Sequence, residues 1–253
     1  MTSTTLFGCA HTRGSLESYA HKFEALELDI LDKPQRPRTP TLRKWRREAG
    51  PTLVFSLVAP AVVCAARPGP ALDAGIEAFL AAQRTLEARW LVVPTPLELT
   101  PSALQRERLA AVVGRIRAGL GDAKDVVHVA WEPKGVWEDD DAVSFAEQLG
   151  VFLAADPLLD PRVPKLLAGA RYLRVRMVGG RTAFPPARMR ALSELLARAE
   201  RDGMERVVIL LTQAASRDAQ RLRKLVREGV SNTDLGGATI IHPRGGFASE
   251  EEE

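Results

Sequence analysis

The sequence is poor in cysteine and histidine, and it lacks the spacings by which these residues build disulfide frameworks or metal sites. Its two cysteines, Cys9 and Cys64, stand in apolar surroundings outside any CxxC or Cys/His pattern. We therefore interpret both as reduced packing residues of a cytosolic protein. No HExxH or comparable spacing occurs among the four histidines, which are His11, His21, His128 and His242. The sequence therefore predicts no metal site.

Signatures of nucleotide cofactors and of serine hydrolases are absent as well. The chain contains no GxGxxG after a predicted strand, no GxxxxGK followed by serine or threonine, and no GxSxG. We therefore expect no bound cofactor. Gly179 and Gly180, followed by Arg181, fit a simple turn, and the alternative is a loop that presents its backbone amides to a phosphate.

A long hydrophobic run and an amino-terminal signal are likewise missing. Residues Met1–Phe7 contain no basic segment followed by an apolar run, which disfavours secretion. The most apolar stretch, Leu53–Ala66, is too short to span a bilayer and is interrupted by Pro60. It is typical of a buried strand with its exit loop. We expect a cytoplasmic protein with no membrane contact.

What is present is the composition of an ordinary globular domain. The chain has 253 residues, of which 45% are hydrophobic and 26% are charged, and this length can bury a large core without a disulfide or a metal. We assign residues 1–229 to one domain. Residues 230–253 form a carboxyl-terminal extension with a short apolar run, Ala238–Ile241, and an acidic end, Glu250–Glu253, that we expect to be disordered.

Short apolar segments of period two alternate along the chain with segments of helical period. The predicted strands are Thr4–Cys9, Ala25–Ile30, Thr52–Val58, Trp90–Val93, Val126–Trp131, Val151–Ala154, Tyr172–Met177 and Arg206–Leu211. The predicted helices are Leu16–Phe23, Pro40–Glu48, Leu72–Ala88, Pro101–Gly119, Asp139–Leu149, Val163–Ala170, Pro186–Arg201 and Ser216–Glu228. Connections this short require parallel strands, and eight such α/β units close most naturally into a TIM-like (β/α)8 barrel. An open doubly wound sheet is the alternative.

Alternation within three of these strands turns charged side chains toward the inside of the barrel. Residues two apart share a face of a strand, so Glu27 and Asp29 point inward when the leucines between them face the helices. The same alternation turns four further side chains inward, which are His128, Glu132, Arg174 and Arg176. Further candidates for the rim of the barrel are His11, Ser56, Asp156, Arg181, Thr212 and Gln213.

These inward charges support two interpretations. In the functional one, Arg174, Arg176, Arg181 and His11 bind an anionic group, and Glu27, Asp29, His128 or Glu132 transfers a proton. In the structural one, the acids and arginines compensate each other in a buried ion network, because an isolated charge in a low dielectric is costly. The sequence is compatible with both.

Several short segments follow one another in an order typical of a known family. They are Gly8-Cys9, Tyr19-Ala20, Phe23 and Leu26-Glu27-Leu28, then Leu42-Arg43-Lys44-Trp45-Arg46 and Phe55-Ser56-Leu57, and later Trp137, Arg176 and Gly179. In this combination the chain resembles the YecE-like family, known as domain of unknown function 72, whose members resemble a TIM barrel. The resemblance implies that Glu27 and Arg176 belong to the polar set of the family's pocket. It names no reaction.

The chain departs from the family pattern at the rim of that pocket. Asp29 stands where the family has asparagine and then an aromatic pair, and Val178 stands where the family has histidine. Further family polar positions are occupied by Val58, Val92, Ala130-Trp131-Glu132 and Thr212-Gln213. The resemblance therefore implies a divergent member.

Three functional hypotheses follow from the residues. The first is a barrel, with or without catalytic activity, that binds a small anionic or phosphorylated ligand at its carboxyl-terminal mouth. The second is a hydrolase or isomerase that acts on phosphoester or sugar-phosphate substrates through the acids named above. The sequence leaves the oligomeric state open.

The third hypothesis is nucleic-acid binding through a basic segment, residues 33–47. Its cations are Lys33, Arg36, Arg38, Arg43, Lys44, Arg46 and Arg47, whereas the net charge of the whole chain is only +3. The cations could neutralise phosphates, but Trp45 is the one nearby aromatic that could stack on a base. The alternative is a solvated helix face.

Overall fold

Eight parallel strands close into a barrel in the computed structural model of the chain. The structure describes residues 5–10, 14–138, 142–159, 171–177, 182–199 and 204–228. Strand order follows chain order around the barrel, and the eighth strand pairs with the first. The strands are β1 (Thr5–Cys9), β2 (Ala25–Leu28), β3 (Val54–Val58), β4 (Trp90–Pro94), β5 (His128–Glu132), β6 (Phe152–Ala155), β7 (Tyr172–Arg176) and β8 (Arg206–Leu211). The predicted (β/α)8 barrel is confirmed, and the open sheet is not.

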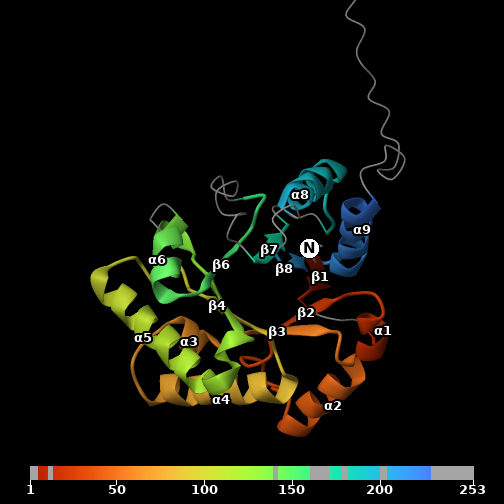
Figure 1. The fold of residues 1–253 in the computed structure, drawn as a ribbon. Helices are drawn as coiled ribbons and strands as arrows, with labels where there is room; N and C mark the ends of the chain where they lie inside the picture. The colour runs from red at the N-terminus through yellow and green to blue at the C-terminus, as the bar shows by residue number, and fades with distance from the viewer. Residues whose placement is uncertain are drawn as a thin grey trace, which may run out of the picture.

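Helices follow the strands and cover the outside of the barrel (Figure 1). The α-helices are α1 (Leu16–Ala20), α2 (Thr39–Ala49), α3 (Ala61–Cys64), α4 (Pro70–Leu86), α5 (Ala103–Leu120), α6 (Ala142–Leu149), α8 (Pro186–Ala199) and α9 (Ala215–Glu228). Two short 3-10 helices are η1 (Gly121–Asp125) and η2 (Gly135–Glu138). The exit loop expected after the third strand contains α3, a single helical turn that begins directly after Pro60.

Two apolar clusters hold this architecture together. The larger one packs the outward faces of the strands against the helices, as Leu26, Leu57 and Leu91 illustrate. The smaller one fills the inside of the barrel and includes Trp90 and Tyr172, both fully buried. Successive side chains of a strand point alternately toward the helices and toward the inside of the barrel. The strands therefore contribute to both clusters.

Both cysteines are free and buried, which confirms their interpretation as reduced packing residues. Burial raises the pKa of the Cys9 thiol to about 11 and that of the Cys64 thiol to about 12. The Cys64 Sγ donates to the Ala59 carbonyl oxygen at 3.3 Å. Both groups are therefore thiols at neutral pH.

Parts of the predicted pattern fall outside the described residues. These are the helix expected over 163–170 and the carboxyl-terminal extension, residues 230–253. Among the helices that are described, none combines the length and the apolar character needed to cross a membrane.

Gly8 of β1 lies directly beside Ala25 of β2. A Cβ atom at this position would overlap the backbone carbonyl of Ala25 on the neighbouring strand. Because backbone cannot rotate away as a side chain can, we expect Gly8→Ala to lower the free energy of unfolding by about 1–3 kcal/mol. Urea denaturation measures this change.

Gly114 of α5 provides the matched control for this substitution. A Cβ atom there meets nothing within 4 Å, and alanine favours a helix by up to about 1 kcal/mol over glycine. We therefore expect Gly114→Ala to be neutral or stabilising. Equal stability of the Gly8→Ala protein and the wild type would contradict the close approach of β1 and β2.

Candidate functional site

Four charged side chains from three separate strands meet inside the carboxyl-terminal half of the barrel. Glu27 is the third residue of β2, Glu132 ends β5, and Arg174 and Arg176 belong to β7. Neither β2 nor β5 is a neighbour of β7 in the sheet. The contacts between these residues therefore cross the lumen of the barrel.

The four side chains form one continuous chain of ion pairs. Arg174 donates from Nη2 to Glu27 Oε1 at 2.8 Å and from Nη1 to Glu132 Oε2. The second Glu132 oxygen pairs with Nη2 of Arg176. The Tyr172 hydroxyl donates to the remaining Glu27 oxygen, Oε2, at 2.9 Å. We call Glu27, Glu132, Arg174 and Arg176 the lumen cluster.

The lumen cluster balances two carboxylates against two guanidinium groups. Glu27, Glu132 and Arg174 are 1%, 4% and 8% exposed, whereas the Arg176 side chain keeps 34% of its surface exposed. Burial alone would lower the pKa of Arg174, but its two glutamate partners raise that pKa above its ordinary value. The cluster is thus compensated and lies mostly beneath the surface.

Asp156 holds the backbone at the carboxyl end of β7, next to the lumen cluster. It follows β6 directly, and its Oδ2 accepts from the Arg176 backbone N–H at 2.7 Å while Oδ1 accepts from the Leu158 N–H at 3.0 Å. Burial raises the pKa of its carboxyl group in spite of these two donors. Asp156 therefore positions the end of β7, from which Arg176 extends.

Two predicted proton-transfer residues lie apart from the lumen cluster. Strand β2 ends at Leu28, so Asp29 does not continue its inward face; its side chain is 54% exposed and lies 4.0 Å from Lys33. His128 is the first residue of β5, at the amino end of the barrel, whereas Glu132 is the last. The structure thus brings together Glu27 and Glu132 but neither Asp29 nor His128 with them.

The structure describes only some of the predicted rim residues. His11 and Arg181 lie outside the described residues. Ser56 is buried opposite Glu27 in the β2–β3 register. Thr212 donates to Asp218 of α9 at 3.1 Å.

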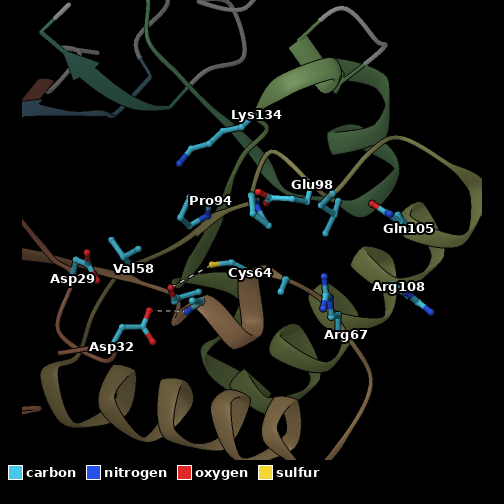
Figure 2. A pocket seen from close by; sticks show the side chains of 15 residues that line it. Asp29, Asp32, Val58, Cys64, Arg67, Pro94, Glu98, Gln105, Arg108 and Lys134 are labelled. Atoms are coloured by element: carbon cyan, nitrogen blue, oxygen red, sulfur yellow. Dashed lines mark hydrogen bonds between the residues drawn. The ribbon is translucent and has the colours of Figure 1, made fainter. Parts of the chain in front are cut away.

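A pocket of about 450 Å³ opens beside the barrel mouth. Its walls come from segments that follow the carboxyl ends of β2, β3, β4 and β5, including α3 (Figure 2). Val58, Pro94 and the buried Cys64 supply apolar lining. The charged lining residues are Asp29, Asp32, Arg67, Glu98, Arg108 and Lys134. We call this cavity the mouth pocket.

The cations of the mouth pocket are less engaged than two of its three acids, Asp29 and Asp32. Asp32 accepts from the Ala61 backbone N–H at 2.7 Å and thereby caps α3, and Asp29 faces Lys33. Within the described part of the chain, no ion pair joins Arg67, Arg108 or Lys134 to an acid. The pocket therefore has cationic groups that are available to a ligand.

Sequence reasoning overlooked these three cations because they do not lie on strands. Arg67 follows α3, Arg108 is on α5, and Lys134 stands two residues after the end of β5. The available signal was their position after a strand, since the loops and helix starts at this end of a barrel form its binding face. Among the described residues, no group of three or more histidine, cysteine or acidic side chains could hold a metal ion.

The bridging role of Arg174 makes the lumen cluster sensitive to loss of one carboxylate. Glu27→Gln leaves the buried Arg174 without full compensation, and we expect it to lower the free energy of unfolding by about 3–5 kcal/mol. Asp29→Asn removes a carboxylate two residues away, where exposure limits the effect to less than about 1 kcal/mol. Chemical denaturation of both variants tests this, and equal stabilities would contradict the described cluster.

His128 gives the fold a specific dependence on pH. Its ring lies 4.8 Å from that of Trp90, and burial, followed by Arg171 and Arg89, lowers its pKa below 6.5. The neutral form is therefore favoured in the folded state, and stability is lost as pH falls below the unfolded-state pKa.

We expect His128→Phe to reduce the fall in melting temperature between about pH 7 and about pH 5. The exposed His21 allows the same substitution as a control, and His21→Phe should leave the fall unchanged. The prediction is wrong if the wild type and His128→Phe lose the same number of degrees.

Comparisons with known proteins address both the family and the fold. A family model described as "Protein of unknown function DUF72" matches residues 7–239. A crystal structure of a DUF72 family protein from Enterococcus faecalis matches with a TM-score of 0.68 and 15% identity, covering 89% of this chain and 98% of that one. A DUF72 family protein from Thermotoga maritima matches with a TM-score of 0.56 and 12% identity, covering 81% and 85%.

The fold is also similar to that of sugar epimerases. D-psicose 3-epimerase from Clostridium cellulolyticum, solved with D-tagatose, matches with a TM-score of 0.61 and 15% identity, covering 90% of this chain and 99% of that one. At such identity the likeness is one of fold. No curated protein sequence matches the chain. Because the family model spans most of its length, the chain belongs to DUF72, the YecE-like family.

Proposed function

We propose that this barrel binds a small anionic molecule in the mouth pocket. The observation that carries the proposal is that Arg67, Arg108 and Lys134 all line one cavity and have no acidic ion-pair partner among the described residues. The cavity stands at the carboxyl ends of the strands, which is the functional face of (β/α)8 barrels. Its volume of about 450 Å³ suits a metabolite rather than a macromolecule.

The lumen arginines are the weaker anchors for such a ligand. Arg174 already donates to both Glu27 and Glu132, and Arg176 pairs with the free oxygen of Glu132. An anion at either guanidinium group would have to compete with a carboxylate that is held in place. The unpaired cations of the mouth pocket impose no such competition.

The chemistry of the pocket favours a carboxylate or phosphate group. Guanidinium groups of Arg67 and Arg108 can each present two parallel donors, and the ammonium group of Lys134 acts as a compact charge. Figure 2 places Asp29 and Asp32 on the opposite side of Cys64 from Arg67 and Arg108. An anionic group is therefore best accommodated at the side of the two arginines.

The catalytic alternative, a hydrolase or isomerase of phosphorylated substrates, remains a prediction with less support. The oxygens of Glu27 and Glu132 are occupied by Arg174, Arg176 and Tyr172. His128 stands at the opposite end of β5. The acids and the histidine proposed for proton transfer therefore do not surround a common point.

Calorimetric titration with glycerol phosphate tests the binding proposal. We expect saturable binding, no binding of uncharged glycerol, and a rise in the dissociation constant of roughly tenfold in Arg67→Met and in Arg108→Met. Arg190→Met supplies the control, because this exposed arginine on α8 lies far along the chain from the pocket and is not part of its lining. Its affinity should equal that of the wild type.

Two results would overturn the assignment. Failure to bind glycerol phosphate, inorganic phosphate or citrate would remove anion binding as the function. Binding that survives Arg67→Met and Arg108→Met but is lost in Arg176→Met would move the anion from the mouth pocket to the lumen arginines. Circular dichroism on each variant establishes that the fold is retained.

A further inference from the structure

A second concentration of positive charge lies on the outside of the barrel, between α2 and α4, which pack side by side (Figure 1). Two cavities of about 430 Å³ and 570 Å³ adjoin along these helices and share Thr39, Ala81 and Thr85 in their lining. They therefore form one extended groove. Its arginines are Arg36, Arg38, Arg43, Arg46, Arg47 and Arg84.

Most of these arginines make no polar side-chain contact within the described residues. Lys33 and Lys44, also in this basic segment, face Asp29 and Glu48, and Arg46 donates to the Leu53 carbonyl and lies over the Phe55 ring. No hydrogen bond or ion pair within the described residues engages the side chains of the other groove arginines, which are Arg36, Arg38, Arg43, Arg47 and Arg84. Five cations without such partners thus line the groove, together with Arg46 and one acid, Glu87.

Helix stability explains only part of this charge. Arg47 and Arg84 stand in the last turns of α2 and α4, where cations complement the helix dipole. Arg38, however, occupies the position before the first turn of α2, and that turn contains no acid. A cation there opposes the dipole. Its presence indicates a use outside the helix.

The groove favours phosphates over bases. Its lining contains no aromatic side chain among the described residues, so it has no surface on which bases could stack. Trp45, the aromatic of this helix, packs against the main core. Arginines spread along a groove match a ligand whose charges repeat along a chain.

We propose that the α2–α4 groove binds the phosphodiester backbone of a nucleic acid without reading its sequence. The site is independent of the mouth pocket, since the two share no lining residue. Binding releases counterions from the backbone in proportion to the phosphates neutralised. Affinity is therefore set by salt concentration and by the number of groove arginines rather than by base sequence.

Fluorescence anisotropy with labelled DNA duplexes of two unrelated sequences, and with an RNA strand, tests the proposal. The expected result is similar affinity for both duplexes, with a loss on the order of 100-fold between about 50 mM and about 200 mM salt. Arg43→Gln/Arg84→Gln, one change on each helix, should weaken binding and reduce the slope of log affinity against log salt by about 2. Both residues are exposed, so the fold should be retained.

Arg190→Gln/Arg217→Gln is the matched control, because it removes the same charge from exposed positions on α8 and α9. Binding by this control should equal that of the wild type. The proposal is overturned if neither duplex nor RNA binds at low salt, or if the control loses as much affinity as the groove variant. A polyglutamate of matched charge that binds as tightly as the duplex would overturn the assignment to nucleic acid.

Discussion

Arg174 joins three strands that the sheet itself does not bring together. From β7 its guanidinium group reaches Glu27 on β2 and Glu132 on β5, while backbone ladders connect each strand only to its immediate neighbours. An arginine suits this position because its planar group has donors on two sides. Once one of these three charges is buried, the others are required, since an unpaired ion in the barrel interior costs several kcal/mol, about 3–5 when a partner is removed.

The need to pair the buried charges determines where charged groups without partners are available to a ligand. A neutral lumen cluster, with Tyr172 completing the Glu27 carboxylate, pairs its charged groups with one another and leaves only the Arg176 side chain partly exposed. The uncompensated cations lie further out, on loops and helices that follow the strands. In this protein the structural interpretation of buried charge applies to the lumen cluster, and our proposal places the ligand at other residues of the carboxyl-terminal face.

The period of two was sufficient to identify Glu27, Glu132 and Arg174 as inward-facing residues, and the strand and helix alternation was sufficient to predict the barrel. The period of two predicted the wrong position for the Asp29 side chain, because the strand and its inward face end at Leu28. The period also does not predict where along the barrel axis a side chain lies. His128 and Glu132 share a face of β5 but lie at its two ends. Lys134 belongs to a loop, where no period places a side chain, so its contribution to the pocket required the three-dimensional structure.

The net charge of this protein does not predict which ligands its sites attract, because a ligand interacts mainly with the charged groups close to it. Fields in salt solution decay over about 8–10 Å, so a phosphate at the mouth pocket is governed by Arg67, Arg108 and Lys134, and a polyanion beside α2 by the groove arginines. A total of +3 sums these surpluses with acids elsewhere on the chain. Since the pocket encloses a small volume and the groove extends along two helices, we propose that one site selects compact anions and the other selects long ones.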